Sequence, residues 1–214
     1  MTDDTLARPS TVRRAAVSRD GATAIAFGVL TVAFVVAMAT VPAFFDWTFA
    51  RHHNVVSWYV RPLFLIPLCL FAYRRSLAGI SITVFLLATS MFWFPAPASP
   101  DPSVADFLQI EMDYITSPWG PAKVVGTALV PLTLGALAVA LWRRNLYVGL
   151  IVLVLIAVLK MTWSVLAAGD SGFGVFAPAI IGLLLCTVLV WYGFRRAEKS
   201  AGAPRIRARR SGRA

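Results

Sequence analysis

Residues 146–168 read LYVGLIVLVLIAVLKMTWSVLAA, and this stretch decides the fold class. It is apolar over the roughly 20 residues that a helix needs to cross the hydrocarbon core of a bilayer, and its one charged residue is Lys160. The whole chain of 214 residues agrees, with 58% hydrophobic residues and 14% charged ones, where soluble domains average about 25% charged. The sequence therefore predicts an integral membrane protein.

Five further apolar runs resemble this one in length, so the predicted fold class is an all-α membrane protein, a bundle of six transmembrane helices. An interfacial amphipathic helix is expected between spans three and four. The predicted spans are residues 22–45, 55–73, 77–94, 124–142, 146–168 and 173–194. They form a domain over residues 22–196, flanked by basic tails at 1–21 and 197–214, the second of which is expected to be disordered in isolation.

The basic residues alternate between the loops, and this bias predicts the orientation. If there are six spans, most of the chain's 20 basic residues fall on one side, in the two tails and in the pairs Arg74-Arg75 and Arg143-Arg144. Positively charged loops remain in the cytoplasm, so both termini are expected there. The predicted location is the cell membrane, with multiple passes.

The net charge of +10 then indicates contact with anionic lipids at the cytoplasmic basic clusters rather than nucleic-acid binding. Besides the bilayer, a protein partner in the membrane is a further expected kind of partner. Cys69 and Cys186 lie in apolar runs with no metal-ligand spacing, and no metal or cofactor is predicted.

Small residues at helical spacing predict where the helices pack, because close approach drives association in membranes. Prolines inside the spans free backbone carbonyls and are expected to kink their helices. The predicted packing stripes are Gly174, Pro178, Gly182 and Cys186 in span six, and Ala22, Ala26, Ala33 and Ala37 in span one; the prolines include Pro62 and Pro67.

Two cations inside apolar spans, Arg61 and Lys160, are not explained by topology. Each costs a few kcal/mol at the bilayer centre, so an intramembrane charge is a candidate functional residue by default. Both are expected about 10–12 Å inside the outer boundary, at 1.5 Å per residue. The alternative interpretation is that both side chains extend outward to the interface.

The loop at 95–123 is expected to hold an amphipathic helix that starts at Ser103, capped with Asp106, and runs to about Ser117. Glu111 falls in the middle of the apolar face of this helix, so it is predicted to meet Arg61, Lys160 or both. Two interpretations remain open. The three residues form either a structural ion pair that pins the helix to the bundle, or a charged ligand site beneath it. The predicted apolar face consists of Val104, Phe107, Leu108, Met112 and Ile115.

His52 and His53 stand at the outer mouth of span two, where proton exchange is a secondary hypothesis. A metal bound there would need acids such as Glu111 or Asp113 as additional ligands, and no metal is predicted. Asp113 is grouped with the histidines as a secondary site residue.

The chain contains no DxD, HExxH, CxxC, P-loop or GxSxG motif, and no catalytic residue is predicted. We expect a non-catalytic protein that binds, carries or senses an anionic or amphipathic ligand at its extracytoplasmic face, or that serves as an accessory subunit of a membrane complex. The alternative is a membrane-embedded enzyme acting on lipid headgroups, with Glu111 or a histidine as general base.

Overall fold

The structure is a computed structural model that describes the backbone of residues 8–211 and the side chains of residues 19–197. The described backbone is all-helical, without a strand. In chain order the elements are α1 (Arg8–Thr40), α2 (Pro42–His52), α3 (Val56–Leu63), α4 (Leu65–Tyr73), α5 (Leu77–Thr89), the 3₁₀ turn η1 (Ser90–Phe92), α6 (Pro102–Thr116), α7 (Pro121–Trp142), α8 (Leu146–Ala168), the 3₁₀ segment η2 (Gly169–Val175) and α9 (Phe176–Ser211).

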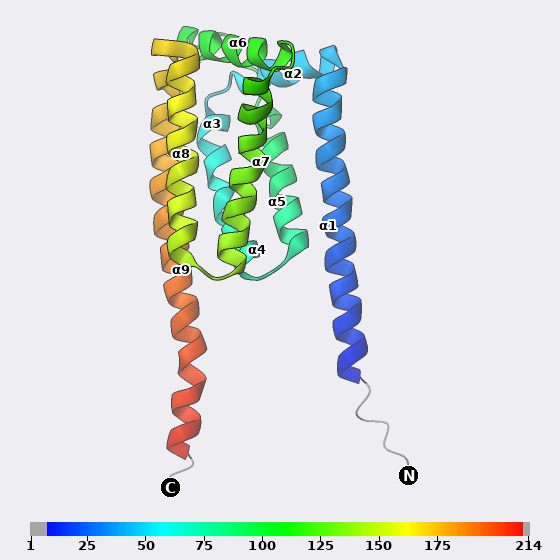
Figure 1. Cartoon of the computed structure of the whole chain (residues 1–214), viewed down its shortest axis with the longest axis vertical. Helices are drawn as coiled ribbons and strands as arrows, with labels where there is room; N and C mark the ends of the chain where they lie inside the picture. The colour runs from blue at the N-terminus through cyan, green and yellow to red at the C-terminus, as the bar shows by residue number, and fades with distance from the viewer. Residues whose placement is uncertain (1–7, 212–214) are drawn as a thin grey trace.

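Four helical stretches are long and apolar enough to cross a membrane: Arg19–Thr40, Val56–Tyr73, Pro121–Trp142 and Leu146–Ala197. The last of these contains α8 and the first part of α9, which turn back on each other at η2 and run side by side (Figure 1). A further apolar helical stretch, Leu77–Phe92, is shorter. The chain is therefore a helical protein of the membrane type.

The long helices stand roughly parallel, with α2 and α6 lying across one end of the bundle (Figure 1). Both ends of the described chain, and the α4–α5 and α7–α8 turns, lie toward the opposite end. We call the end covered by α2 and α6 the capped end, and the other the turn end. The tail from residue 197, expected to be disordered in isolation, continues as helix to Ser211. Propagating an existing helix costs less than nucleating a new one.

The first predicted span, residues 22–45, is too long, because α1 ends at Thr40 and the chain turns into α2. Pro42 causes the break. The residue before a proline is driven out of the α conformation, and Val41 has φ −117° and ψ 93°. Pro42 then occupies the first turn of α2, where no amide donor is needed.

The second span is interrupted at Phe64, between α3 and α4. Pro67 has no amide hydrogen to donate to the carbonyl of Leu63, so the regular hydrogen-bond ladder cannot continue through this point. The Phe64 amide instead bonds back to the Arg61 carbonyl at 3.2 Å. The interruption lies next to Arg61, on the side toward the turn end.

The predicted small-residue stripe of α9 packs against α3. A Cβ at Gly182 would meet the ring of Pro62, and the Cys186 thiol donates to the Pro62 carbonyl at 3.3 Å. A Cβ at Gly174 would lie 3.9 Å from the Trp58 ring. The stripe is a packing face that lets α9 approach α3 closely.

The predicted alanine stripe of α1 is wrong, because Ala22, Ala26 and Ala33 are exposed. The helix packs on α5 through another face, with the Phe27 and Phe85 rings 5.6 Å apart. The half-buried face of α1 carries both large and small side chains, among them Ala24, Phe27, Gly28 and Ala37. The exposed face of α1 is apolar.

Asp20 attaches α1 to the start of α5, a contact that sequence analysis missed. Its carboxylate accepts hydrogen bonds from the Ser76 hydroxyl at 2.8 Å and from the Leu77 amide at 2.9 Å. The first amides of a helix have no partner inside the helix and carry partial positive charge, so a carboxylate there is stabilising.

The α4–α5 and α7–α8 turns have the same construction. Arg75 and Arg144 each adopt φ 58° just after a helix, and the next residue caps the following helix. Ser76 accepts from the Gly79 amide, and Asn145 accepts from the Val148 amide, both at 3.1 Å. The left-handed residue ends one helix and the polar side chain starts the next.

Contacts between these turns are reciprocal. Arg75 donates to the Trp142 carbonyl at 3.4 Å, and Arg144 lies 4.9 Å over the Tyr73 ring, so each arginine reaches the aromatic residue that ends the other helix. One contact from each arginine therefore joins the α4–α5 and α7–α8 hairpins at the turn end.

Gly182→Ala is expected to destabilise the bundle by about 1–3 kcal/mol, because the added methyl group meets the Pro62 ring and forces α9 away from α3. Thermal melting of the purified protein in detergent should report this as a loss of several degrees. Gly193→Ala, on the same helix with nothing within 4 Å of the new Cβ, is the matched control and should leave the melting temperature unchanged or slightly raised. Equal melting of the two variants would contradict the close α3–α9 packing.

Candidate functional site

The helix α6 covers the capped end and begins at Pro102, with its N-cap two residues before the expected one. Asp101, not Ser103, is its N-cap, accepting from the Ser103 amide at 2.8 Å and hydroxyl at 2.6 Å. These bonds to the charged form lower the pKa of Asp101. Pro102 occupies the first turn, one residue before the predicted start of the helix.

The apolar face of α6 packs onto a cluster of aromatic side chains. Val104, Phe107 and Leu108 are buried as predicted, and the Phe107 ring lies 5.4 Å from Trp58 and 6.2 Å from Trp163. Met112 packs at the edge of the cluster and Ile115 is exposed, so the buried face is narrower than expected. This packing fixes which side of α6 faces the bundle.

Lys123 holds the C-terminal end of α6, a role that sequence analysis missed. Its ammonium group donates to the carbonyls of Ile115 and Ser117, each at 2.6 Å, and lies 4.8 Å from the Trp119 ring. The side chain is buried, 7% exposed. A cation here supplies hydrogen bonds to the last carbonyls of a helix, which have no partner inside the helix. The signal available in the sequence was a lysine shortly after the expected end of this helix.

Glu111 meets Lys160, as predicted. Glu111 Oε1 lies 2.6 Å from Lys160 Nζ, joining α6 to α8. The lysine ammonium also lies 5.0 Å from the Trp163 ring and 5.3 Å from Phe107, where the ring faces favour a cation. The Glu111 side chain is 17% exposed and that of Lys160 is 45% exposed, so the pair is open on the lysine side.

Within residues 19–197, Lys160 pairs with Glu111 and Arg61 does not, so one of the two predicted partners makes the ion pair. Its Nη1 lies 3.2 Å from Nε2 of His52, which α2 presents at its C-terminal end. The Glu111 charge still acts on the guanidinium through space. Arg61 was expected to need a carboxylate, but a neutral imidazole nitrogen supplies its hydrogen bond.

The hydrogen bonds around His52 form a chain with one consistent direction. Because a guanidinium can only donate, His52 Nε2 must be the acceptor, and the ring proton sits on Nδ1. Nδ1 then donates to the Ser57 hydroxyl at 3.0 Å, and Ser57 donates to the Asn54 carbonyl at 2.8 Å. The Trp58 indole donates to the His52 carbonyl at 3.1 Å, fixing the backbone as well. The arrangement requires a neutral His52.

The surroundings of His52 favour that neutral state. The side chain is 4% exposed, and burial is the main cause that lowers its pKa well below the ordinary value of 6.5. The positive charges of Arg61 and Lys160, with a contribution from His53, lower this pKa further.

His53 and Asp113 do not join this network. His53 Nδ1 bonds the Phe49 carbonyl at 2.7 Å, and Asp113 accepts from the Gln109 amide at 2.9 Å on the outer side of α6. Within residues 19–197, no three His, Cys, Asp or Glu side chains are grouped closely enough to hold a metal ion.

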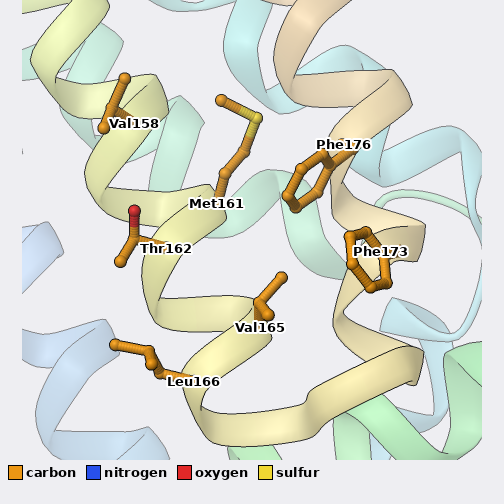
Figure 2. A pocket seen from close by; sticks show the side chains of 7 residues that line it. All are labelled: Val158, Met161, Thr162, Val165, Leu166, Phe173 and Phe176. Carbon is orange, nitrogen blue, oxygen red and sulfur yellow. The ribbon is translucent and has the colours of Figure 1, made fainter.

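A shallow groove of about 410 Å³ lies on another face of α8, where it meets η2 and the start of α9 (Figure 2). Its lining is apolar except for Thr162, and none of the site's charged residues contributes to it. The lining residues are Val158, Met161, Thr162, Val165, Leu166, Phe173 and Phe176. The groove is separate from the charged site.

The site at the capped end thus combines Arg61, Lys160 and Glu111 with a neutral histidine, in an all-helical protein of membrane type. No known protein family matches the chain, and no curated protein or solved structure is significantly similar to it.

Removing both partners of the Glu111–Lys160 pair should destabilise the protein by less than the two single removals added together. Glu111→Gln or Lys160→Gln leaves a charge without its counter-ion in a weakly hydrated setting, so each should melt several degrees below the wild type in detergent. The double variant should lose less than the sum of the two single losses, which a double-mutant cycle measures directly. Asp113→Asn, on the exposed side of the same helix, is the control. Additive losses would mean that the two residues do not interact.

The stability of the protein should depend on pH through His52. Its pKa is lower in the native state than in the unfolded chain, so the unfolded state takes up the proton first as the pH falls. Stability is therefore complete above about pH 6.5 and declines below it. Melting temperatures measured from pH 7.5 to 5.5 should fall for the wild type and for His53→Gln, and fall less steeply for His52→Gln. Parallel curves for all three would refute the assignment.

Proposed function

We propose that the chain is a six-span protein of the cell membrane with both termini in the cytoplasm and with α2 and α6 at the extracytoplasmic surface. In this topology the spans are α1, α3 with α4, α5 with η1, α7, α8 and α9, and α6 is interfacial. The position of both ends and both arginine-rich turns at the turn end supports it (Figure 1).

We propose further that the protein is not an enzyme but binds the anionic head of an amphipathic ligand at the capped end. The observation that carries this proposal is the charge balance. Arg61 and Lys160 bring two positive charges, Glu111 brings one negative charge, and His52 is neutral. A charge left uncompensated at this depth in a bilayer is costly, so the site favours one additional anion.

Access to the site is from the side of Lys160, whose side chain is 45% exposed while its carboxylate partner is more covered. A carboxylate, sulfonate or phosphodiester head would approach Lys160 and Arg61, with its alkyl chain left in the bilayer. Glu111 is then the resting counter-ion that the ligand displaces. Release of Glu111 would loosen the contact of α6 with the bundle. A sensing or carrier role requires a conformational change of this kind that is coupled to ligand binding.

Catalysis on lipid headgroups is the alternative function, but the hydrogen bonds of His52 and Glu111 favour ligand binding without catalysis. A general base needs a free lone pair beside the substrate. The Nε2 lone pair of His52 accepts from Arg61, and Glu111 is held by Lys160. Support of a larger membrane complex through a protein partner is compatible with the same site.

The cytoplasmic basic clusters are proposed to contact anionic lipids. Arg74, Arg75, Arg143 and Arg144 are exposed at the turn end, where a surface of anionic headgroups would neutralise them. The arginines and lysines of residues 1–18 and 198–214 lie outside the described side chains.

Binding of a dansyl-labelled alkyl sulfonate tests the proposal, because this probe keeps its negative charge at every pH used. With the protein in nanodiscs of zwitterionic lipid, energy transfer from tryptophan should show saturable binding. Arg61→Gln and Lys160→Gln should weaken it about tenfold or more, whereas Arg143→Gln at the other end of the bundle should not.

Glu111→Gln provides the sharper arm of this experiment. If Glu111 is a counter-ion that the ligand displaces, its neutralisation should tighten binding even though it destabilises the fold. A weaker affinity in Glu111→Gln, or equal losses in Arg61→Gln and Arg143→Gln, would contradict the proposed site.

A further inference from the structure

We propose that anion binding at Arg61 is coupled to the uptake of one proton by His52, so that an imidazolium and a guanidinium hold the ligand's oxyanion between them. This inference rests on the proposed function, because it concerns the regulation of that same site. The geometry that carries it is the contact of 3.2 Å between Arg61 Nη1 and His52 Nε2.

Only Nε2 of His52 is available to change its protonation state. The Nδ1 proton is committed to the Ser57 hydroxyl at 3.0 Å, and Ser57 in turn donates to the Asn54 carbonyl at 2.8 Å. A proton from solvent therefore adds to the Nε2 lone pair that now accepts from Arg61. Its addition replaces an attractive contact between donor and acceptor with two donors facing each other.

Protonation without an anion is disfavoured first by the burial of His52 and then by the surrounding charges. Arg61 from α3, Lys160 from α8 and His53 beside it all oppose a positive charge on His52. The one acid that faces this region from α6, Glu111, is engaged by Lys160. η1 and α1 also pack on α2 and contribute no titratable group there, because η1 has the sequence Ser-Met-Phe and residues 21–40 of α1 contain none.

An oxyanion between the two groups removes this conflict. Its oxygens accept from the new Nε2–H and from the guanidinium, and its charge offsets the added positive charge. Binding and protonation therefore favour each other by the same factor, as linkage requires. The affinity for a permanently charged anion should rise as the pH falls, by up to tenfold per pH unit while the free site is neutral and the bound site is protonated.

The ligand class that fits is an oxyanion with two or more acceptor oxygens on one head, which is a carboxylate, sulfonate or phosphodiester. Such a head can come from a membrane amphiphile or from a free ion in the external solution. Competition distinguishes the two sources. Methanesulfonate should displace the alkyl sulfonate at similar concentrations if the head is sufficient, and only at far higher concentrations if the alkyl chain contributes.

The experiment measures alkyl sulfonate affinity from pH 7.5 to 5.5 on the full chain in zwitterionic nanodiscs. The wild type and His53→Gln should bind at least about tenfold more tightly at pH 5.5, and His52→Gln should bind with little dependence on pH. Calorimetry of the wild type in two buffers of different ionisation enthalpy should find about one proton taken up per bound anion. This second measurement keeps the test valid if His52→Gln fails to fold.

The outcomes separate the two proposals. Saturable binding that depends on Arg61 but not on pH, with no proton uptake, would overturn the role of His52 and leave the proposed function standing. Equal pH dependence in the wild type and His52→Gln would do the same. The absence of saturable binding at every pH would overturn both.

Discussion

The ion pair between Glu111 and Lys160 is the constraint on which the capped end depends. A lysine eight residues inside the end of an apolar helix, roughly 12 Å along its axis, needs either water or a carboxylate. Glu111 supplies the carboxylate from α6, so α6 must lie across the bundle with the face that carries Glu111 turned toward it. Burial of Phe107 between Trp58 and Trp163 then strengthens the same placement.

The capped end and the turn end are built on different principles. At the turn end, equivalent residues of two hairpins make reciprocal contacts, and Arg75 and Arg144 serve the same purpose. At the capped end, this equivalence breaks down. When the two hairpins are aligned on their arginine pairs, Pro62 corresponds to Pro131, but Arg61 corresponds to Val130. The shared framework therefore does not require a charge at Arg61, which is a reason to interpret it as functional.

Much of the helical framework could be predicted from hydropathy, because the apolar composition of each long segment is by itself enough to favour a helix inside the bilayer. The pairing of Glu111 with Lys160 was also predictable, since a carboxylate on an apolar helix face has few partners available. Contacts between segments distant in sequence could not be predicted in this way. Asp20 at the start of α5 and His52 as the acceptor for Arg61 depend on how helices lie against each other, which periodicity does not encode. The start of α2 was missed because its residues 42–45 extend the first apolar run, and only Pro42 marked the break.

In the proposed topology, with six spans and both termini in the cytoplasm, the capped end lies outside the cell. Single cysteines introduced in a variant lacking Cys69 and Cys186 test this directly, with a membrane-impermeant maleimide applied to intact cells. A cysteine at Asp106 on α6 should be labelled from outside, and one at Tyr147 beside the α7–α8 turn should be labelled only after permeabilisation. Labelling of position 147 but not 106 in intact cells, or of both, would contradict the topology and the extracytoplasmic site.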